Sequence, residues 1–264
     1  MTVSTRTNGL SHAVMDTDYP LNSIDWLTML IAFDTVSRHS NLALIEDVQR
    51  YCEQLGLSVD LTFNDAKNKA NLFVTVAAGG NANNSANNSA NSSADIFNHG
   101  LVLSGHTDVV PVDGQEWTSE PFTATIRGDK LYGRGACDMK GFIACALTLL
   151  PKAVKLSNAG QLRRPLHLAL SFDEEVGCLG APLILADLKA RGITPEYCIV
   201  GEPTNMTMVV AHKGIAVYRC RVHGKSAHSS LTATGVNAIS YASRLIGYVD
   251  SLAEEISHRD DNDA

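Results

Sequence analysis

Hydrophobic positions follow two different periods along this chain, and the alternation between the two predicts alternating helices and strands. Apolar side chains recur every three or four residues in four segments, at 23–31, 41–56, 141–150 and 181–191. This spacing places them on one face of an amphipathic helix. We expect Ser23 to cap the first helix, Gly56 to end the second, and Pro151 to limit or kink the third.

A period of two residues marks the predicted strands. Apolar and polar side chains alternate at 57–63, 72–76 and 166–172, and continuous apolar runs at 101–103 and 197–200 predict buried strands. A further stretch at 126–131, interrupted by Gly128 and Asp129, predicts a hairpin. Strands that alternate with helices indicate a layered α/β fold.

Two segments depart from this pattern. Residues 81–94 consist only of Asn, Ser and Ala, which cannot bury apolar area, so we predict a surface loop. Beyond about Met208, a predicted long strand at 215–222 and an amphipathic helix at 236–249 form the opening half of a second, α+β domain. We therefore predict a disordered extension at 1–21, a first domain at 22–208 and an incomplete second domain at 209–264, which ends in a tail too charged to pack.

The composition limits the partners and the location. With 264 residues, 45% of them hydrophobic, the chain can bury a sizeable core. A net charge of −7 argues against nucleic acid or an anionic membrane as a partner, because both require basic patches. No apolar run has transmembrane length and the first 20 residues contain no apolar signal segment, so we expect a cytoplasmic protein.

Six cysteines are spread along the chain without a CxxC pair. Most of them lie in apolar segments, which predicts buried, reduced thiols rather than a disulfide framework. They are Cys52, Cys137, Cys145, Cys178, Cys198 and Cys220.

Several acidic or imidazole side chains lie where predicted strands give way to turns. His106 lies in SGHTDVVP, Glu174 and Glu175 lie in SFDEEVGCLGAP, and Glu202 lies in VGEPT. Asp138 lies in GRGACDMKG, where flanking glycines allow a tight turn. In open α/β sheets, ligands bind at the carboxyl ends of the strands. Imidazole and carboxylate ligands suit zinc, and adjacent glutamates can divide the tasks of ligand and base.

Each motif also has a simpler structural interpretation. Asp108 can fix the imidazole tautomer of His106 from the position two residues on, but the same H-x-D segment could be a capped strand end. Asp138 could cap a helix, the glutamate pair could be the acidic first turn of a helix, and Glu202 could begin a chain reversal at Pro203. The metal interpretation depends on the motifs together, because they share their position at strand ends.

Taken in order, SGHTDVVP, LYGRGACDMKG, SFDEEVGCLGAP, VGEPT and HGKSAHSS resemble the dinuclear zinc aminoacylase and carboxypeptidase family. The resemblance extends from about Asn22 onward, apart from the Asn/Ser-rich insert. Within the family, EEVGCLGA and AHKG are most similar to acetylornithine deacetylases. The resemblance implies a zinc-exopeptidase-like catalytic domain, with a central mixed sheet flanked by helices, followed by the first half of an α+β lid and dimerisation domain.

The resemblance also implies a role for each ligand. His106 and Glu202 would bind one zinc ion, Glu175 would bind the other, and Asp138 would bridge the two. Such a site holds two Zn²⁺ ions, and Co²⁺ is a possible substitute. Asp108 would orient His106.

Two further residues would take part in the hydrolysis of a small N-acyl amino acid. Glu174 would act as the general base and then as the general acid. His228, in AHSS, would stabilise the oxyanion, commonly in the site of the partner subunit, which implies a homodimer.

Family members supply a last zinc-binding histidine from further along their chains, whereas only His258 follows His228 here. We therefore predict that the chain is truncated, or that the remainder resides on another chain. In either case we expect the isolated polypeptide to bind the second zinc poorly and to be weakly active or inactive.

The leading hypothesis is deacetylation of N2-acetyl-L-ornithine in arginine biosynthesis. A succinyl-diaminopimelate desuccinylase, dipeptidase or carboxypeptidase of the same family is the alternative, because these enzymes share the metal ligands. A second alternative is a non-catalytic remnant that binds one metal ion or a partner chain.

Overall fold

A computed structural model describes residues 19–79, 97–211 and 214–258 of the chain. It contains two compact units, one ending at Pro203 and the other beginning at Thr204. The Asn/Ser-rich segment at 81–94 and most of the predicted N-terminal extension lie outside the described residues. None of the described helices is long and apolar enough to cross a membrane.

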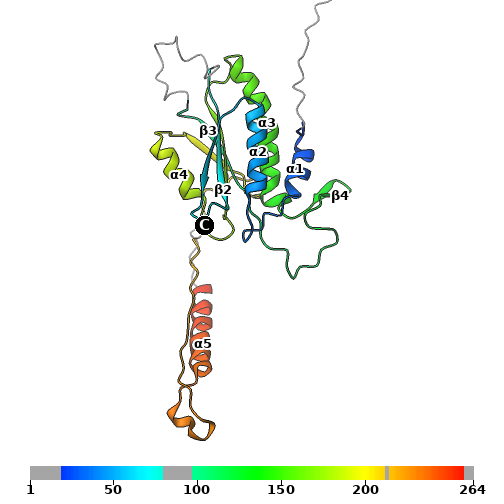
Figure 1. The fold of residues 1–264 in the computed structure, drawn as a ribbon. Coiled ribbons are helices and arrows are strands. Elements are labelled where there is room, and N and C mark those ends of the chain that lie inside the picture. The colour runs from blue at the N-terminus through cyan, green and yellow to red at the C-terminus, as the bar shows by residue number, and fades with distance from the viewer. Residues whose placement is uncertain (1–18, 80–96, 212–213, 259–264) are drawn as a thin grey trace, which may run out of the picture. The chain divides into compact units, whose positions relative to one another are not determined.

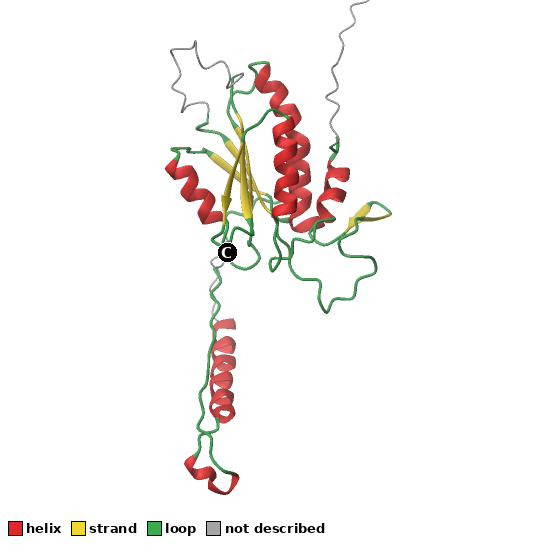
Figure 2. Cartoon of the chain, viewed as in Figure 1, coloured by secondary structure: helices red, strands yellow, loops and turns green. Residues whose placement is uncertain are grey.

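The first unit contains alternating helices and strands (Figures 1 and 2). Its described helices are α1 (Ser23–Ile31), α2 (Leu42–Gln54), α3 (Gly141–Asn158) and α4 (Ala181–Ala190), with a π-helical turn η2 (Ala136–Lys140) directly before α3. Its described strands are β1 (Val59–Phe63), β2 (Ala70–Val76), β3 (Leu101–His106), β4 (Thr125–Arg127), β5 (Lys130–Tyr132), β6 (Leu166–Ser171) and β7 (Tyr197–Val200).

Five of these strands form one sheet in the order β1-β2-β6-β3-β7, and β4 pairs with β5 as the predicted hairpin. The pairs β1–β2 and β2–β6 are antiparallel, whereas β6–β3 and β3–β7 are parallel. The sheet is therefore mixed and flanked by helices, which confirms the predicted α/β class. The three parallel strands all end at the same edge of the sheet, and that edge carries the candidate site.

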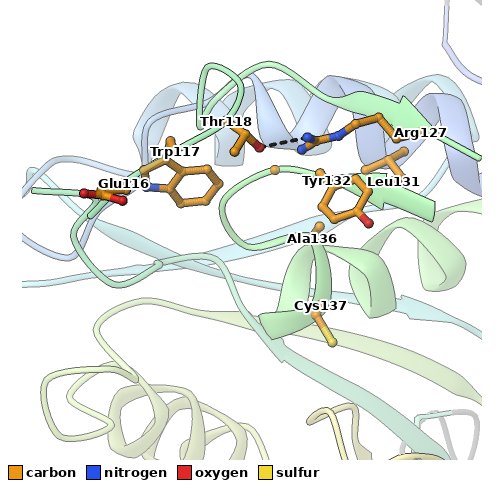
Figure 3. A pocket seen from close by; sticks show the side chains of 9 residues that line it. Glu116, Trp117, Thr118, Arg127, Leu131, Tyr132, Ala136 and Cys137 are labelled. Carbon is orange, nitrogen blue, oxygen red and sulfur yellow. Dashed lines mark hydrogen bonds between the residues drawn. The ribbon is translucent and has the colours of Figure 1, made fainter. Parts of the chain in front are cut away.

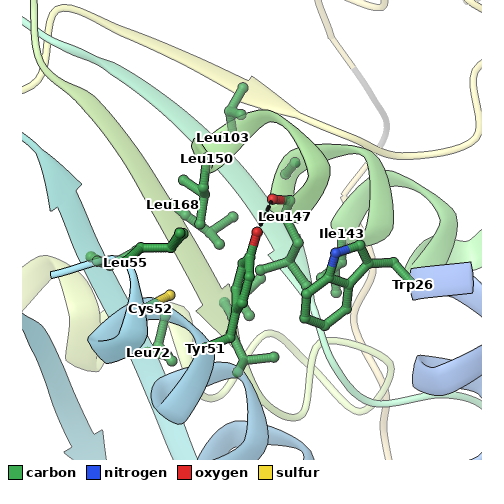
Figure 4. Packing of buried hydrophobic residues seen from close by; sticks show 14 of the residues in the cluster. Trp26, Tyr51, Cys52, Leu55, Leu72, Leu103, Ile143, Leu147, Leu150 and Leu168 are labelled. Carbon is green, nitrogen blue, oxygen red and sulfur yellow. Dashed lines mark hydrogen bonds between the residues drawn. The ribbon is translucent and has the colours of Figure 1, made fainter. Parts of the chain in front are cut away.

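Alternation within each strand decides which helices pack on which face. Leu72 of β2 and Leu168 of β6 lie in the large core with α1, α2 and α3 (Figure 4). Their neighbours Phe73 and Ala169 point to the opposite face, where Leu188 of α4 covers them. Burial of one such leucine stabilises the fold by about 1.5–3 kcal/mol. The two-residue period thus determines both layers around the sheet.

Two details of the predicted helices were wrong. Asn22 rather than Ser23 caps α1, because its side-chain oxygen accepts the N–H groups of Ile24 and Asp25 at 3.0 and 2.9 Å. Of the two predicted effects of Pro151, a limit or a kink, the limit was wrong, because helix α3 continues through Pro151 to Asn158.

The environment of the proline explains the continuous helix. A proline removes the hydrogen bond to the carbonyl four residues earlier, which here belongs to Leu147. The hydroxyl of Tyr51 donates to that carbonyl at 3.2 Å, so the buried oxygen is not left without a partner (Figure 4).

Predicted burial was also wrong at β7 and at most cysteines. All four residues of β7 are exposed, because β7 is the last strand of the sheet in the described residues. Only Cys52 is buried, whereas the other five thiols are free and exposed. An apolar neighbourhood in the sequence therefore did not determine burial.

The second unit contains helix α5 (Ala238–Ser257) and a short 3-10 helix η3 (Ser229–Thr234). The predicted strand at 215–222 was wrong: its residues are irregular and pair with no strand in the described part of the chain. A strand needs a partner for its backbone hydrogen bonds, and the described residues offer this segment none. Helix α5 extends eight residues beyond the predicted end at Val249, because helical hydrogen bonds are local.

Candidate metal centre

The predicted ligands meet at the edge where the parallel strands end. His106 is the last residue of β3 and is paired in register with Ser171, the last residue of β6. Glu174 and Glu175 follow β6 after a short turn, and Glu202 follows β7 after one residue. Because β3, β6 and β7 run in the same direction, their following residues lie close together despite a separation of almost a hundred positions in the sequence.

Asp138 reaches this edge from the turn before α3. Gly135 has φ +77°, and a Cβ atom there would lie 2.6 Å from Val109 Cγ1, so only glycine fits this close approach. Lys140, at the other end of the same turn, is fully buried. It donates hydrogen bonds to the carbonyls of Leu30 and Phe33 at 2.9 and 2.8 Å, which holds the turn against these residues. Burial lowers the pKa of Lys140 to about 7.

The imidazole of His106 is the centre of the cluster. Its Nε2 atom lies 3.0 Å from Asp138 Oδ1, 3.8 Å from Glu174 Oε2 and 3.8 Å from Glu202 Oε1. Two groups of donor atoms, each within 4.8 Å of one another, share this histidine: one with Asp138 and Glu202, and one with Glu174 and Glu175. The four carboxylates predicted as ligands or base thus come together around the predicted imidazole.

The other nitrogen of His106 faces Asp108, but the shorter contact is with the backbone. Nδ1 lies 2.8 Å from the carbonyl oxygen of Asp108 and 3.6 Å from its carboxylate. A carbonyl can only accept, so Nδ1 carries a proton whether the ring is charged or neutral, and Nε2 is the nitrogen that a bound cation would take in place of a proton. Burial alone would lower the pKa of His106, but Asp108 and then Glu202 outweigh burial and raise the pKa to about 9.

The Asp108 carboxylate holds the glutamate pair in place. It accepts the backbone N–H groups of Glu174 and Glu175 at 3.0 and 3.3 Å, and the hydroxyl of Ser37 at 2.7 Å. Burial alone would raise its pKa, but these hydrogen bonds and the nearby His106 lower it. One buried carboxylate therefore connects the imidazole to both glutamates.

The donor set fits a divalent cation. One imidazole nitrogen and several carboxylate oxygens are ligands that zinc accepts. Burial first, and then the neighbouring Asp138, raise the pKa of Glu175, and burial followed by Asp138 and Glu174 does the same for Glu202 against the opposing effect of His106. The part of these shifts that comes from neighbouring carboxylates reflects negative charge gathered at the site, and a bound cation would compensate it.

Two cavities adjoin this edge. The smaller, of about 190 Å³, is lined by Asp138 and Glu175. The larger, of about 440 Å³, lies beside the β4–β5 hairpin, between the rings of Trp117 and Tyr132 (Figure 3). Both are lined by the segment that includes Cys137, so they border the same stretch of backbone next to the ligands.

His228 belongs to the second compact unit. It precedes η3, where its Nδ1 accepts the backbone N–H of Ser230 at 3.2 Å, and it is exposed. Its role in oxyanion stabilisation stays a prediction.

The sequence did not predict several residues that support the site. Ser37, Lys69, Asn71 and Lys140 are buried polar side chains, each bonded to a segment far away in the sequence. Nothing in their local sequence distinguishes them from exposed polar residues. The only available signal was their position beside apolar runs, as for Lys69 directly before β2 and Asn71 near its start.

With this geometry in view, comparisons with known proteins identify the family. The model of Peptidase family M20/M25/M40 matches residues 102–259, more than half of the chain, and the chain belongs to this family. Acetylornithine deacetylase of Proteus mirabilis is 35% identical over 234 residues, which are 88% of this chain and 54% of that protein. The corresponding protein of Yersinia pseudotuberculosis is 37% identical over 88% of this chain and 55% of its own length. The chain thus spans about half the length of these curated relatives.

Solved structures agree on the fold. A putative aminohydrolase from methicillin resistant Staphylococcus aureus matches with a TM-score of 0.53 at 16% identity, over 88% of this chain and 56% of that one. An M20 family metallo-carboxypeptidase from Sulfolobus solfataricus matches with a TM-score of 0.52 at 21% identity, over 68% of this chain and 37% of that one.

Proposed function

We propose that this chain carries the metal centre of an amidohydrolase that converts N2-acetyl-L-ornithine to L-ornithine and acetate in arginine biosynthesis. The observation that carries the proposal is the convergence of one imidazole and four carboxylates in two donor groups that share His106. The names of the relatives at 35% and 37% identity support the choice of substrate.

In this proposal the metal is zinc, with Co²⁺ as a possible substitute. His106 and Glu202 would hold one ion, Glu175 would hold the second, and Asp138 would serve both. Both donor groups include His106, and one imidazole assigned to the first ion leaves the second ion with carboxylates alone within the described residues. We therefore expect one tightly bound ion and one weakly bound ion. When bound, such ions supply Lewis-acid activation of the acyl oxygen and of water.

The protein side chains move the proton in this scheme. Glu174, whose Oε2 lies 3.8 Å from His106 Nε2, accepts a proton from the attacking water and then donates it to the departing amine nitrogen. Asp108 keeps the proton of His106 on Nδ1, so that Nε2 remains available as a ligand. His228 of a homodimer would stabilise the negative charge that develops on the acyl oxygen.

Metal titration is the first test. The purified, metal-free chain is titrated with Zn²⁺ against a chromogenic chelator, alongside His106→Ala and, as a matched control, His258→Ala in the exposed end of α5. We expect one tight equivalent in the parent chain and in the control, and none in His106→Ala. Equal zinc binding by all three proteins would contradict the proposed centre.

A substrate panel is the second test. With zinc or cobalt in excess, the chain is assayed on N2-acetyl-L-ornithine, N-succinyl-diaminopimelate and dipeptides. We expect weak activity that favours acetylornithine, and Glu174→Gln should lower it by ~10²–10⁴-fold without loss of the tight zinc. The exposed Glu46→Gln variant is the control. A preference for either other substrate class would replace the proposed reaction with that of a sibling enzyme.

A further inference from the structure

The turn that carries Glu174 and Glu175 begins at a buried, charged residue in an uncommon backbone conformation. Asp173 has φ +55°, and only 8% of its surface is exposed. The left-handed backbone conformation is sterically unfavourable for residues other than glycine, although aspartate and asparagine adopt it more readily than most. This conformation turns the chain away from β6 and directs the next two residues towards His106. The direction of both glutamates thus depends on what holds Asp173.

Lys69, directly before β2, holds Asp173 in place. Its ammonium donates hydrogen bonds to the Asp173 carboxylate and to the backbone carbonyl of Ser37, and both charged side chains are about nine-tenths buried. Ser37 in turn donates its hydroxyl to Asp108, which accepts the backbone N–H of Glu174. One ammonium group is therefore connected to the glutamate turn by two routes, through Asp173 directly and through Ser37 and Asp108.

The far end of the turn is fixed independently. Asn71, two residues after Lys69, accepts the backbone N–H of Phe172 at 3.1 Å and donates to the carbonyl of Gly180 at 2.9 Å. A Cβ atom at Gly180 would lie 2.4 Å from the Asn71 side-chain oxygen, so the two segments are in close contact. Asn71 holds both ends of the turn, at Phe172 and Gly180. Loss of Lys69 should therefore change the conformation and charge at Asp173 while the two ends of the turn stay in place.

We infer that Lys69 is a positioning residue of the metal centre, which acts through Asp173 and Ser37 to hold Glu174 and Glu175 in the direction that a cation requires. This inference rests on the proposed function. Without the ammonium, a buried carboxylate would stand unpaired one residue from Glu174. The turn would then relax towards solvent, and the second donor group would lose its geometry. Residues that orient metal ligands in this way typically contribute 10–100-fold to metal affinity.

Zinc affinity of the purified chain tests the inference without the need for turnover. Lys69→Met should weaken binding of the second zinc, the ion assigned to Glu175, by ~10–100-fold and leave the tight zinc unchanged, whereas Lys69→Arg, which keeps the charge, should stay nearer to the parent chain. Asp173→Asn preserves the tolerance for a positive φ and removes only the charge, so it isolates the ion pair. The double variant Lys69→Met with Asp173→Asn should recover part of the affinity lost in Lys69→Met, because no buried charge is left unpaired. The exposed Lys189→Met on α4 is the matched control.

The outcomes separate the inference from the function. If the parent chain binds no zinc, the proposed function fails and the inference fails with it. If the parent chain binds a first zinc but no second zinc at saturation, or if a folded Lys69→Met binds the second zinc as well as the parent chain does, only the inference fails. A lower unfolding temperature of the metal-free Lys69→Met with unchanged zinc affinity assigns Lys69 to stability alone and overturns the positioning role. If Lys69→Met does not fold, unchanged zinc affinity in Asp173→Asn would overturn the positioning role in the same way.

Discussion

The two compact units of this chain have similar hydrophobic patterns but opposite burial. In the first unit, apolar residues such as Leu168 are fully buried between the sheet and its helices. In the second unit, none of the described residues is buried, and Ile246 on the apolar face of α5 is 61% exposed. Predicted helices form in both units, but a predicted strand forms only where a neighbouring strand pairs with it. The comparison shows that a pattern alone determines local structure, whereas burial depends on partners.

The largest expected effect is the loss of a core side chain in the first unit. Leu168→Ala should lower the free energy of unfolding by about 2–5 kcal/mol, because it removes a fully buried side chain and leaves a cavity. The matched Ile246→Ala in α5 should change it by less than about 0.5 kcal/mol. Both tryptophans, Trp26 and Trp117, lie in the first unit, so urea unfolding followed by their fluorescence reports on that unit. A comparable loss for Ile246→Ala in a chain-wide probe such as circular dichroism would show that α5 is buried in solution.

A smaller effect should appear as a dependence of stability on pH. Burial lowers the pKa of His167 in β6 from 6.5 to about 4, and its Nδ1 lies 2.8 Å from Thr75 Oγ1. The unfolded chain therefore binds a proton at a higher pH than the folded chain does. The contribution of the neutral ring is fully present above pH ~6.5 and is lost as the pH falls towards 4, by up to about 3 kcal/mol.

The pH effect is measured as a difference between proteins. The gap in unfolding free energy between the parent chain and His167→Gln should narrow from pH 7 to pH 4, because only the parent carries the titrating ring. If the gap for His167→Gln were constant over this range, the ring would be accessible to protons in the folded state.

The smallest expected effect comes from two matching helix caps. Asn22 caps α1 and Asn237 caps α5, each by accepting two backbone N–H groups with its side-chain oxygen. Replacement of either by alanine should cost about 1 kcal/mol. Asn22→Ala should lower the free energy of unfolding of the whole first unit. Asn237→Ala should lower only the helix content, measured by circular dichroism. Aspartate at either position should preserve the cap. A loss of first-unit stability in Asn237→Ala would contradict the separation of the two units.

Much of the candidate site could be predicted because its residues follow a simple rule of position. His106, Glu174 and Glu202 come after apolar runs, and parallel strands bring such positions to one edge. The support of the site could not be predicted in the same way. Lys69 and Ser37 are ordinary polar residues in the sequence, and they become important only because folding buries them against Asp173 and Asp108.

The fold shows the same division. The sequence by itself determined the helices, the alternation within β2 and β6, and the order of the ligand motifs, because these depend on spacing along the chain. Only the tertiary structure decided that β7 is an exposed edge, that α3 continues through Pro151, and that 215–222 forms no strand. A helix satisfies its hydrogen bonds within itself, whereas a strand, an interior proline and a buried lysine depend on groups supplied by distant residues.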